Sequence, residues 1–203
     1  MKPFRWCVIL VLGFSMLGCS QGGTYRLYLR YQPAREFLAL QEKIGLNLAI
    51  APFKDQRPEP SYVGLLVPLA GNYTYYKSDP SPLENAMKDS LARVLSTYGI
   101  KQVPATDWSG TPDSLAGLEA DSIFMMEIKK FWIEGKAGIL GTDIKASIAL
   151  ILHLGVKKEG KVYTRTIDLE RKTKDTRLTP GLAEQTMNGM LTEIFDSYFS
   201  NPY

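Results

Sequence analysis

The first segment with alternating apolar and polar side chains covers residues 24–32. Its odd positions share an apolar or aromatic side chain: Tyr25, Leu27, Leu29 and Tyr31. A period of two predicts an edge strand or a half-buried strand. A short helix is expected over 33–44, because Pro33 stands early in this segment and Gly45 can end it. Residues 46–53, "LNLAIAPF", then predict a central strand.

Two longer segments carry apolar side chains at helical spacing. The first opens at Ser81-Pro82-Leu83-Glu84, which has the spacing of a capping box, and Gly99 closes it. The second opens at Thr179-Pro180, and its apolar stripe covers six positions: Leu182, Met187, Met190, Leu191, Ile194 and Tyr198. Both segments are therefore predicted to be amphipathic helices.

Three consecutive strands are predicted between these helices, over 121–135, 142–160 and 161–175. Strands that follow one another with short connections form an antiparallel meander. The simplest packing places the helices together on the sheet. The expected fold is α+β, an α/β two-layer sandwich. It has a mixed, largely antiparallel sheet with two main amphipathic helices on one face.

The N-terminus has the layout of a secretory signal. Two basic residues precede an apolar run, 6–17, that is too short for a membrane-spanning helix, which needs about 20 residues. The run leads into Met16-Leu17-Gly18-Cys19, which resembles the bacterial lipobox. The resemblance implies that Cys19 becomes the first mature residue and carries acyl chains. An ordinary signal peptide, cut near Gly18 or Gly23, is the alternative.

The lipobox divides the chain into three parts: a cleaved lipoprotein signal peptide over 1–18, a short membrane tether over 19–24 and a single periplasmic α/β domain over 25–203. Stable anchoring takes at least two acyl chains, which a triacylated Cys19 supplies. Ser20, directly after the cysteine, resembles lipoproteins that are sorted to the outer membrane. We therefore expect a lipid-anchored protein at the periplasmic face of the bacterial outer membrane.

The composition argues against catalysis and against nucleic-acid binding. The two cysteines are Cys7 and Cys19, so a processed, acylated chain holds no disulfide and no thiol nucleophile. The one histidine, His153, lacks the further ligands of a zinc site. The formal net charge is +3, and removing 1–18 takes away two basic residues and no acid, which leaves no excess to attract nucleic acid. We expect no catalytic residue, no metal and no cofactor.

Two segments offer candidate partner contacts. Residues 57–82 are predicted to form a long loop, and its tyrosines suit a binding surface because they are rigid and amphipathic. A merely mobile loop is the alternative. Residues 135–141, "GKAGILG", are predicted to form a hairpin turn, whose apolar tip packs against the sheet or meets a partner or the lipid surface. The candidate contacts are Tyr62, Tyr73, Tyr75, Tyr76, Ile139 and Leu140.

Residues 157–177, "KKEGKVYTRTIDLERKTKDTR", are rich in lysine and arginine. Such residues protect the edge of a sheet against pairing with other chains. The alternative is a patch that binds anionic headgroups or lipopolysaccharide. Both interpretations expect the segment to lie at the surface.

Together with the lipobox, "LNLAIAPFKDQRPEPSYVG" and "LSTYGI" resemble the small YajG-like bacterial lipoproteins, and Asp55 and Arg57 are the most suggestive part. This resemblance implies a periplasm-facing lipoprotein without known catalysis. "TYRLYLRY" is also similar to an early strand of auxiliary lipoproteins of ABC-type transport. Two functions stay open. One is a structural or interaction protein with an envelope protein partner, and the other is a transport accessory that handles lipid or glycolipid.

Overall fold

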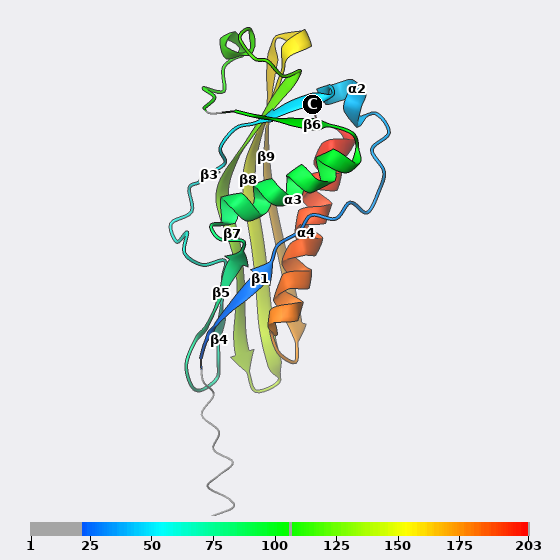
Figure 1. Cartoon of the computed structure of the whole chain (residues 1–203). Coiled ribbons are helices and arrows are strands. Elements are labelled where there is room, and N and C mark those ends of the chain that lie inside the picture. The colour runs from blue at the N-terminus through cyan, green and yellow to red at the C-terminus, as the bar shows by residue number, and fades with distance from the viewer. Residues whose placement is uncertain (1–21, 106, 203) are drawn as a thin grey trace, which may run out of the picture.

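The computed structural model describes residues 22–105 and 107–202 (Figure 1). The predicted signal peptide, 1–18, and the predicted acylation site, Cys19, lie outside these residues. Within them, three α-helices accompany one nine-stranded sheet. Parallel and antiparallel pairings both occur. The fold is therefore mixed α+β, in agreement with the fold class expected from the sequence.

The helices are α2 (Leu40–Ile44), α3 (Leu83–Thr97) and α4 (Pro180–Ser200). The strands are β1 (Thr24–Tyr28), β2 (Asn47–Ile50), β3 (Lys54–Asp55), β4 (Gly64–Val67), β5 (Thr74–Asp79), β6 (Lys101–Pro104), β7 (Ser122–Gly138), β8 (Gly141–Val156) and β9 (Lys161–Asp175). The five strands predicted by periodicity are confirmed as β1, β2, β7, β8 and β9. Their ends differ from the predicted ones by a few residues.

β7 is the central strand because it pairs along both of its edges. Along one edge it pairs in parallel with β2, β3 and β4, one after another. Its length of 17 residues leaves room for all three. Along the other edge it pairs antiparallel with β8, and β8 pairs antiparallel with β9, as the predicted meander requires. β1 is parallel to β5, and β2 is parallel to β6. A largely antiparallel sheet is therefore not confirmed.

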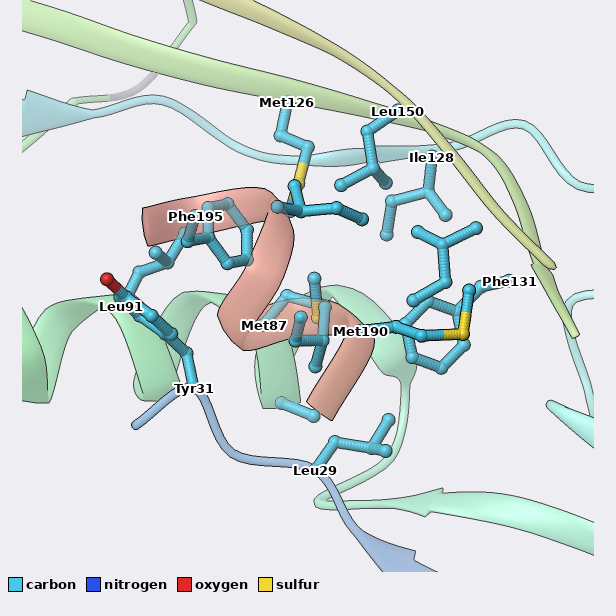
Figure 2. Close-up of a cluster of buried hydrophobic side chains, with 14 of the residues drawn as sticks. Leu29, Tyr31, Met87, Leu91, Met126, Ile128, Phe131, Leu150, Met190 and Phe195 are labelled. Atoms are coloured by element: carbon cyan, nitrogen blue, oxygen red, sulfur yellow. The ribbon is translucent and has the colours of Figure 1, made fainter. Parts of the chain in front are cut away.

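α3 and α4 cross each other on the same face of the sheet (Figure 1). The core lies between them and alternate residues of the central strands. Figure 2 shows its centre, which joins side chains of β7, β8, α3, α4 and the segment after β1: Met126, Ile128, Phe131, Leu150, Met87, Leu91, Met190, Phe195, Leu29 and Tyr31. All of these side chains are buried.

The second face of the sheet is covered at one end. There, Trp108 and Leu115 close a small separate core over Ile123 and Met125, which point away from α3 and α4. Because the described chain packs on both faces at this end, the expected two-layer sandwich is not confirmed. Within residues 22–105 and 107–202, no α-helix covers the rest of this second face, and we call it the helix-free face.

The helix expected over 33–44 is limited to Leu40–Ile44. The residues before it run along α4 because the buried carboxylate of Asp196 holds them. Its oxygens accept a hydrogen bond from the Tyr31 hydroxyl at 2.8 Å and one from the Ala34 backbone N–H at 3.0 Å. These tertiary contacts therefore override the local helix signal at Pro33.

The two long helices begin in different ways. The Oγ1 of Thr179 accepts a hydrogen bond from the Leu182 N–H at 3.2 Å and so caps α4, as the sequence predicts. α3 begins after Pro82 without a side-chain cap, so the capping box predicted at Ser81 is not formed. Gly99 follows α3 with a φ of +68°, which glycine adopts without strain.

Candidate functional site

The segment 57–82 contains a β-hairpin where the sequence predicts a loop. β4 and β5 pair antiparallel within it, with Leu65 opposite Tyr75. β4 joins the central strand β7, and β5 carries β1 on its outer edge. The sheet therefore fixes the directions of Tyr75 and Tyr76, which lie in β5, whereas Tyr62 precedes β4 and Tyr73 lies in the turn between the two strands.

Tyr76 points into the core. Its side chain is fully buried, and its hydroxyl donates a hydrogen bond of 3.0 Å to the carbonyl oxygen of Leu178, just before α4. Burial raises the pKa of this phenol to about 12. Tyr76 was a candidate partner contact from the sequence, but in the fold it is a core residue that no partner can reach.

Tyr62 and Tyr75 pack against each other. Their ring centroids are 4.6 Å apart, and the Lys77 ammonium lies 5.0 Å from the centroid of the Tyr62 ring. Tyr75 and Lys77 alternate with the buried Tyr76 and Ser78, so they belong to the helix-free face. Both tyrosines are half-buried. We call Tyr62 and Tyr75 the tyrosine pair.

A buried ion pair holds the tyrosine pair in place. The Arg57 guanidinium meets the Asp55 carboxylate at 2.6 Å, and the side chains of both are almost fully buried. The same guanidinium donates to the backbone carbonyl of Tyr62 at 2.7 Å and to that of Pro60 at 2.9 Å. The two residues most suggestive in the sequence therefore organise the loop that carries Tyr62.

An open pocket of about 250 Å³ lies beside this ion pair. Its lining comes from the loop after β3 and from the middle of β7: Arg57, Pro58, Glu59, Lys129, Lys130, Phe131 and Trp132. Trp132 is half-buried and faces away from α3 and α4. Arg57 links the two features, because it lines the pocket and also donates a hydrogen bond to the backbone carbonyl of Tyr62.

The remaining candidate contacts gather at one end of the molecule. Ile139 and Leu140, in the turn between β7 and β8, are 89% and 86% exposed. Tyr73, in the turn between β4 and β5, is 54% exposed, and Leu69 in the same turn is 67% exposed. We call these four residues the apolar tip. Leu69 was missed in the sequence because a single leucine in a loop gives no signal.

The two turns are neighbours because β4 and β7 are parallel. Val67, the last residue of β4, lies opposite Lys136, which is close to the end of β7. Both strands therefore reach their turns at the same end of the sheet (Figure 1). β1 also begins at this end, since Thr24 lies opposite Tyr75.

A larger open pocket, of about 800 Å³, lies at the opposite end of the molecule. We call it the distal pocket. Its lining combines apolar side chains with three lysines and two acids, and includes Ile44, Leu46, Val156, Lys43, Lys157, Lys158, Glu42 and Asp121. The Asp121 carboxylate accepts hydrogen bonds from the backbone N–H groups of Leu46 and Asn47 at 2.9 and 2.8 Å. These bonds fix the start of β2 at the rim of the pocket.

His153 is a half-buried residue of β8 on the helix-free face. Its Nδ1 lies 2.9 Å from the Thr164 hydroxyl, and its Nε2 lies 3.5 Å from a Glu127 carboxylate oxygen. Within residues 22–105 and 107–202, no group of histidine, cysteine and acidic side chains could hold a metal ion. In the same part of the chain, no helix is both long and apolar enough to cross a bilayer.

The chain matches no protein-family model. No curated protein is similar to it in sequence. Its fold is similar to that of protein XCC0632 from Xanthomonas campestris, described as DUF330, with 15% identity, a TM-score of 0.56, and 87% of this chain and 92% of that chain covered.

Weaker structural likenesses include two lipoproteins. Lipoprotein GNA1162 from Neisseria meningitidis is 13% identical, with a TM-score of 0.38 over 74% of this chain and 98% of that chain. A minor lipoprotein from Acinetobacter baumannii is 10% identical, with a TM-score of 0.34 over 77% of this chain and 94% of that chain. The comparisons establish a shared fold with the Xanthomonas protein, and they do not confirm a resemblance to YajG-like lipoproteins.

Proposed function

We propose that the protein is a non-catalytic lipoprotein of the bacterial outer membrane, anchored through Cys19 on the periplasmic face, that binds an envelope protein partner. One observation carries this proposal. The described chain enters the fold at one end, at Gly22, three residues after Cys19 in the sequence (Figure 1). Acyl chains on Cys19 would hold this end at the membrane and leave the flanks and the far end of the domain accessible.

The partner surface that the geometry favours is the tyrosine pair with the pocket beside Arg57. Interfaces are enriched in rigid aromatic side chains, and a few such anchors carry most of the binding energy. The ion pair of Asp55 and Arg57 fixes the loop in advance, so binding would cost little ordering of the chain. This surface lies on the helix-free face, which is open to a neighbour along the flank of the molecule.

The anchor is tested by mass spectrometry of the N-terminal peptide of the protein purified from membranes. The expected mass is that of a peptide beginning at Cys19 with acyl chains attached. The Cys19→Ala chain should be left unprocessed or released from the outer membrane. A Cys19→Ala chain that is processed and retained as before would refute the anchor.

The partner surface is tested by crosslinking in cells. Replacing Tyr62 and Tyr75 with serine should lower the affinity for the partner by about thirtyfold, because losing an anchoring aromatic commonly costs about 2 kcal/mol of binding free energy. The yield of the crosslinked complex should fall accordingly. Tyr28→Ser is the matched control, since Tyr28 is an exposed tyrosine outside this surface. An unchanged thermal melt must accompany the loss. Wild-type crosslinking by the double variant would exclude this surface.

The second candidate is an accessory lipoprotein of an ABC-type lipid or glycolipid transport system. The distal pocket favours it, because apolar side chains beside lysines suit a lipid with an anionic headgroup. Lipids extracted from the protein after gentle purification decide between the two functions. A bound lipid that is lost when Leu46 is replaced by aspartate would favour transport, and a lipid-free protein with a crosslinked partner would favour the interaction protein.

A further inference from the structure

Four of the eight large apolar side chains that are exposed in the described part of the chain belong to the apolar tip, at the end where the chain enters the fold. The apolar tip combines two aliphatic residues of the β7–β8 turn, Ile139 and Leu140, with Leu69 and Tyr73 of the β4–β5 turn. The parallel pairing of β4 with β7 brings the two turns together, although about 70 residues separate them in the sequence. A soluble domain normally avoids grouping such residues on its surface, so an apolar tip of this kind marks a contact site.

The N-terminal segment lies directly beside this tip. Gly22 is so close to the β4–β5 turn that a Cβ atom on it would come within 2.4 Å of the Tyr73 carbonyl oxygen. The Tyr75 backbone N–H donates a hydrogen bond of 2.9 Å to the Gly23 carbonyl. Three residues of extended chain reach at most about 11 Å, so an acyl anchor at Cys19 would be limited to that distance from Gly22, which lies beside the tip.

The charges behind the tip suit an anionic lipid surface. An open pocket next to the β7–β8 turn is lined by four lysines and two acids: Lys136, Lys145, Lys172, Lys174, Glu134 and Asp143. Three of these lysines form ion pairs, Lys136 with Glu134, and Lys145 and Lys172 with Glu170, so the surplus of positive charge here is small. Lys174 of β9 lies opposite Asp143 of β8. Asp143 is two residues after Gly141, where β8 begins after the β7–β8 turn. A lysine-rich zone behind an apolar tip matches the order of a bilayer, in which anionic headgroups surround the acyl chains.

We propose that the apolar tip is a membrane-contact site that inserts Leu69, Ile139 and Leu140 into the acyl boundary of the bilayer, with Tyr73 at the level of the headgroups. This inference rests on the proposed acyl anchor at Cys19, because the anchor brings this end to the membrane. Tyrosine prefers the headgroup level, where its ring is shielded and its hydroxyl stays hydrated. The acyl chains and the apolar tip would then both contact the membrane, and together they would fix the orientation of the domain relative to the bilayer.

The test measures the depth of single positions in the full-length protein, purified and reconstituted into vesicles of phosphatidylethanolamine and phosphatidylglycerol. Leu140→Cys carries an environment-sensitive fluorophore, and Leu38→Cys is the matched control because Leu38 is 93% exposed and lies outside the tip, shortly before α2. The chain without an added cysteine gives the background labelling, which should be absent if Cys7 is removed with the signal peptide and Cys19 is acylated. Quenchers attached to the acyl chains should reach the probe at 140, and aqueous iodide should not. The probe at 38 should show the reverse.

Two results would overturn the inference. Equal iodide quenching at both positions would mean that the tip stands in water. Shielding from iodide without quenching by the lipid would mean that a protein covers the tip. Failure of the anchor is recognised separately, because the Cys19→Ala chain would then stay on membranes as before. The probe at position 140 still reports directly on whether the apolar tip contacts lipid.

Discussion

Arg57 belongs to the segment that carries the resemblance to YajG-like lipoproteins, and its role in this fold is structural. Its guanidinium meets one carboxylate, that of Asp55, and three backbone carbonyls, those of Pro60, Tyr62 and Phe131. These contacts satisfy a buried cation from several directions, which a buried charge requires. The ion pair therefore supports the loop that carries Tyr62, and both of its side chains are almost fully buried.

Removing the Arg57 cation should strongly destabilise the protein. Arg57→Met leaves the buried Asp55 carboxylate without its partner, and we expect the free energy of unfolding to fall by about 3 kcal/mol or more. The measurement is urea unfolding followed by circular dichroism. Arg26→Met is the control, because Arg26 is exposed and lies 3.8 Å from Asp79 in a surface ion pair, where the expected change is within about 0.5 kcal/mol. Equal losses in the free energy of unfolding for the two variants would show that the buried ion pair stabilises the fold no more than the surface ion pair does.

At the scale of elements, the β4–β5 hairpin was the main feature that the sequence did not predict. β4 has four residues and β5 has six, and Pro68 and Gly71 between them are typical of loops. Neither strand would be stable alone, and both form because β7 and β1 offer open edges. The inward direction of Tyr76 likewise depends on Leu178, which is 102 residues away in the sequence.

The starts of the two long helices should differ in their sensitivity to mutation. Thr179→Ala removes the side-chain acceptor at the start of α4 and should lower the free energy of unfolding by about 1 kcal/mol. Ser81→Ala should have an effect near zero, because no side chain caps α3. Chemical denaturation of both variants provides the comparison. A larger loss for Ser81→Ala would mean that the capping box forms after all.

Local sequence patterns were sufficient to predict the helices and strands of this fold where these elements are long and regular. The meander over 121–175 and the helix after Thr179 have many periodic residues, so tertiary contacts only adjust their ends. Spatial neighbourhood could not be predicted in the same way. Nothing near Leu69 indicates that its turn lies at the same end of the sheet as Ile139, because that placement depends on the parallel pairing of β4 with β7. The tip was therefore visible in the sequence only as its Ile139-Leu140 half.

Buried tyrosines couple the stability of the whole fold to alkaline pH. Burial raises the pKa of Tyr76 to about 12 and also raises the pKa of Tyr31 and Tyr198, which lie in the same core. In the unfolded chain these phenols ionise near pH 10. Below about pH 9 both states keep the protons, so these groups add no pH dependence there. Between pH 10 and 12 only the unfolded state releases them, which favours unfolding.

The free energy of unfolding should therefore fall as the pH rises above 10, by about 1.4 kcal/mol per pH unit for each of these tyrosines. Urea unfolding at several pH values from 8 to 11.5 measures the slope. Tyr76→Phe removes one of the three ionisations, so its slope should be smaller by about one third. Tyr73→Phe, at an exposed tyrosine of the apolar tip, should keep the wild-type slope. If Tyr76→Phe and the wild type lose stability equally steeply, the phenol of Tyr76 ionises as easily in the folded core as in water, and the core is open to solvent at that point.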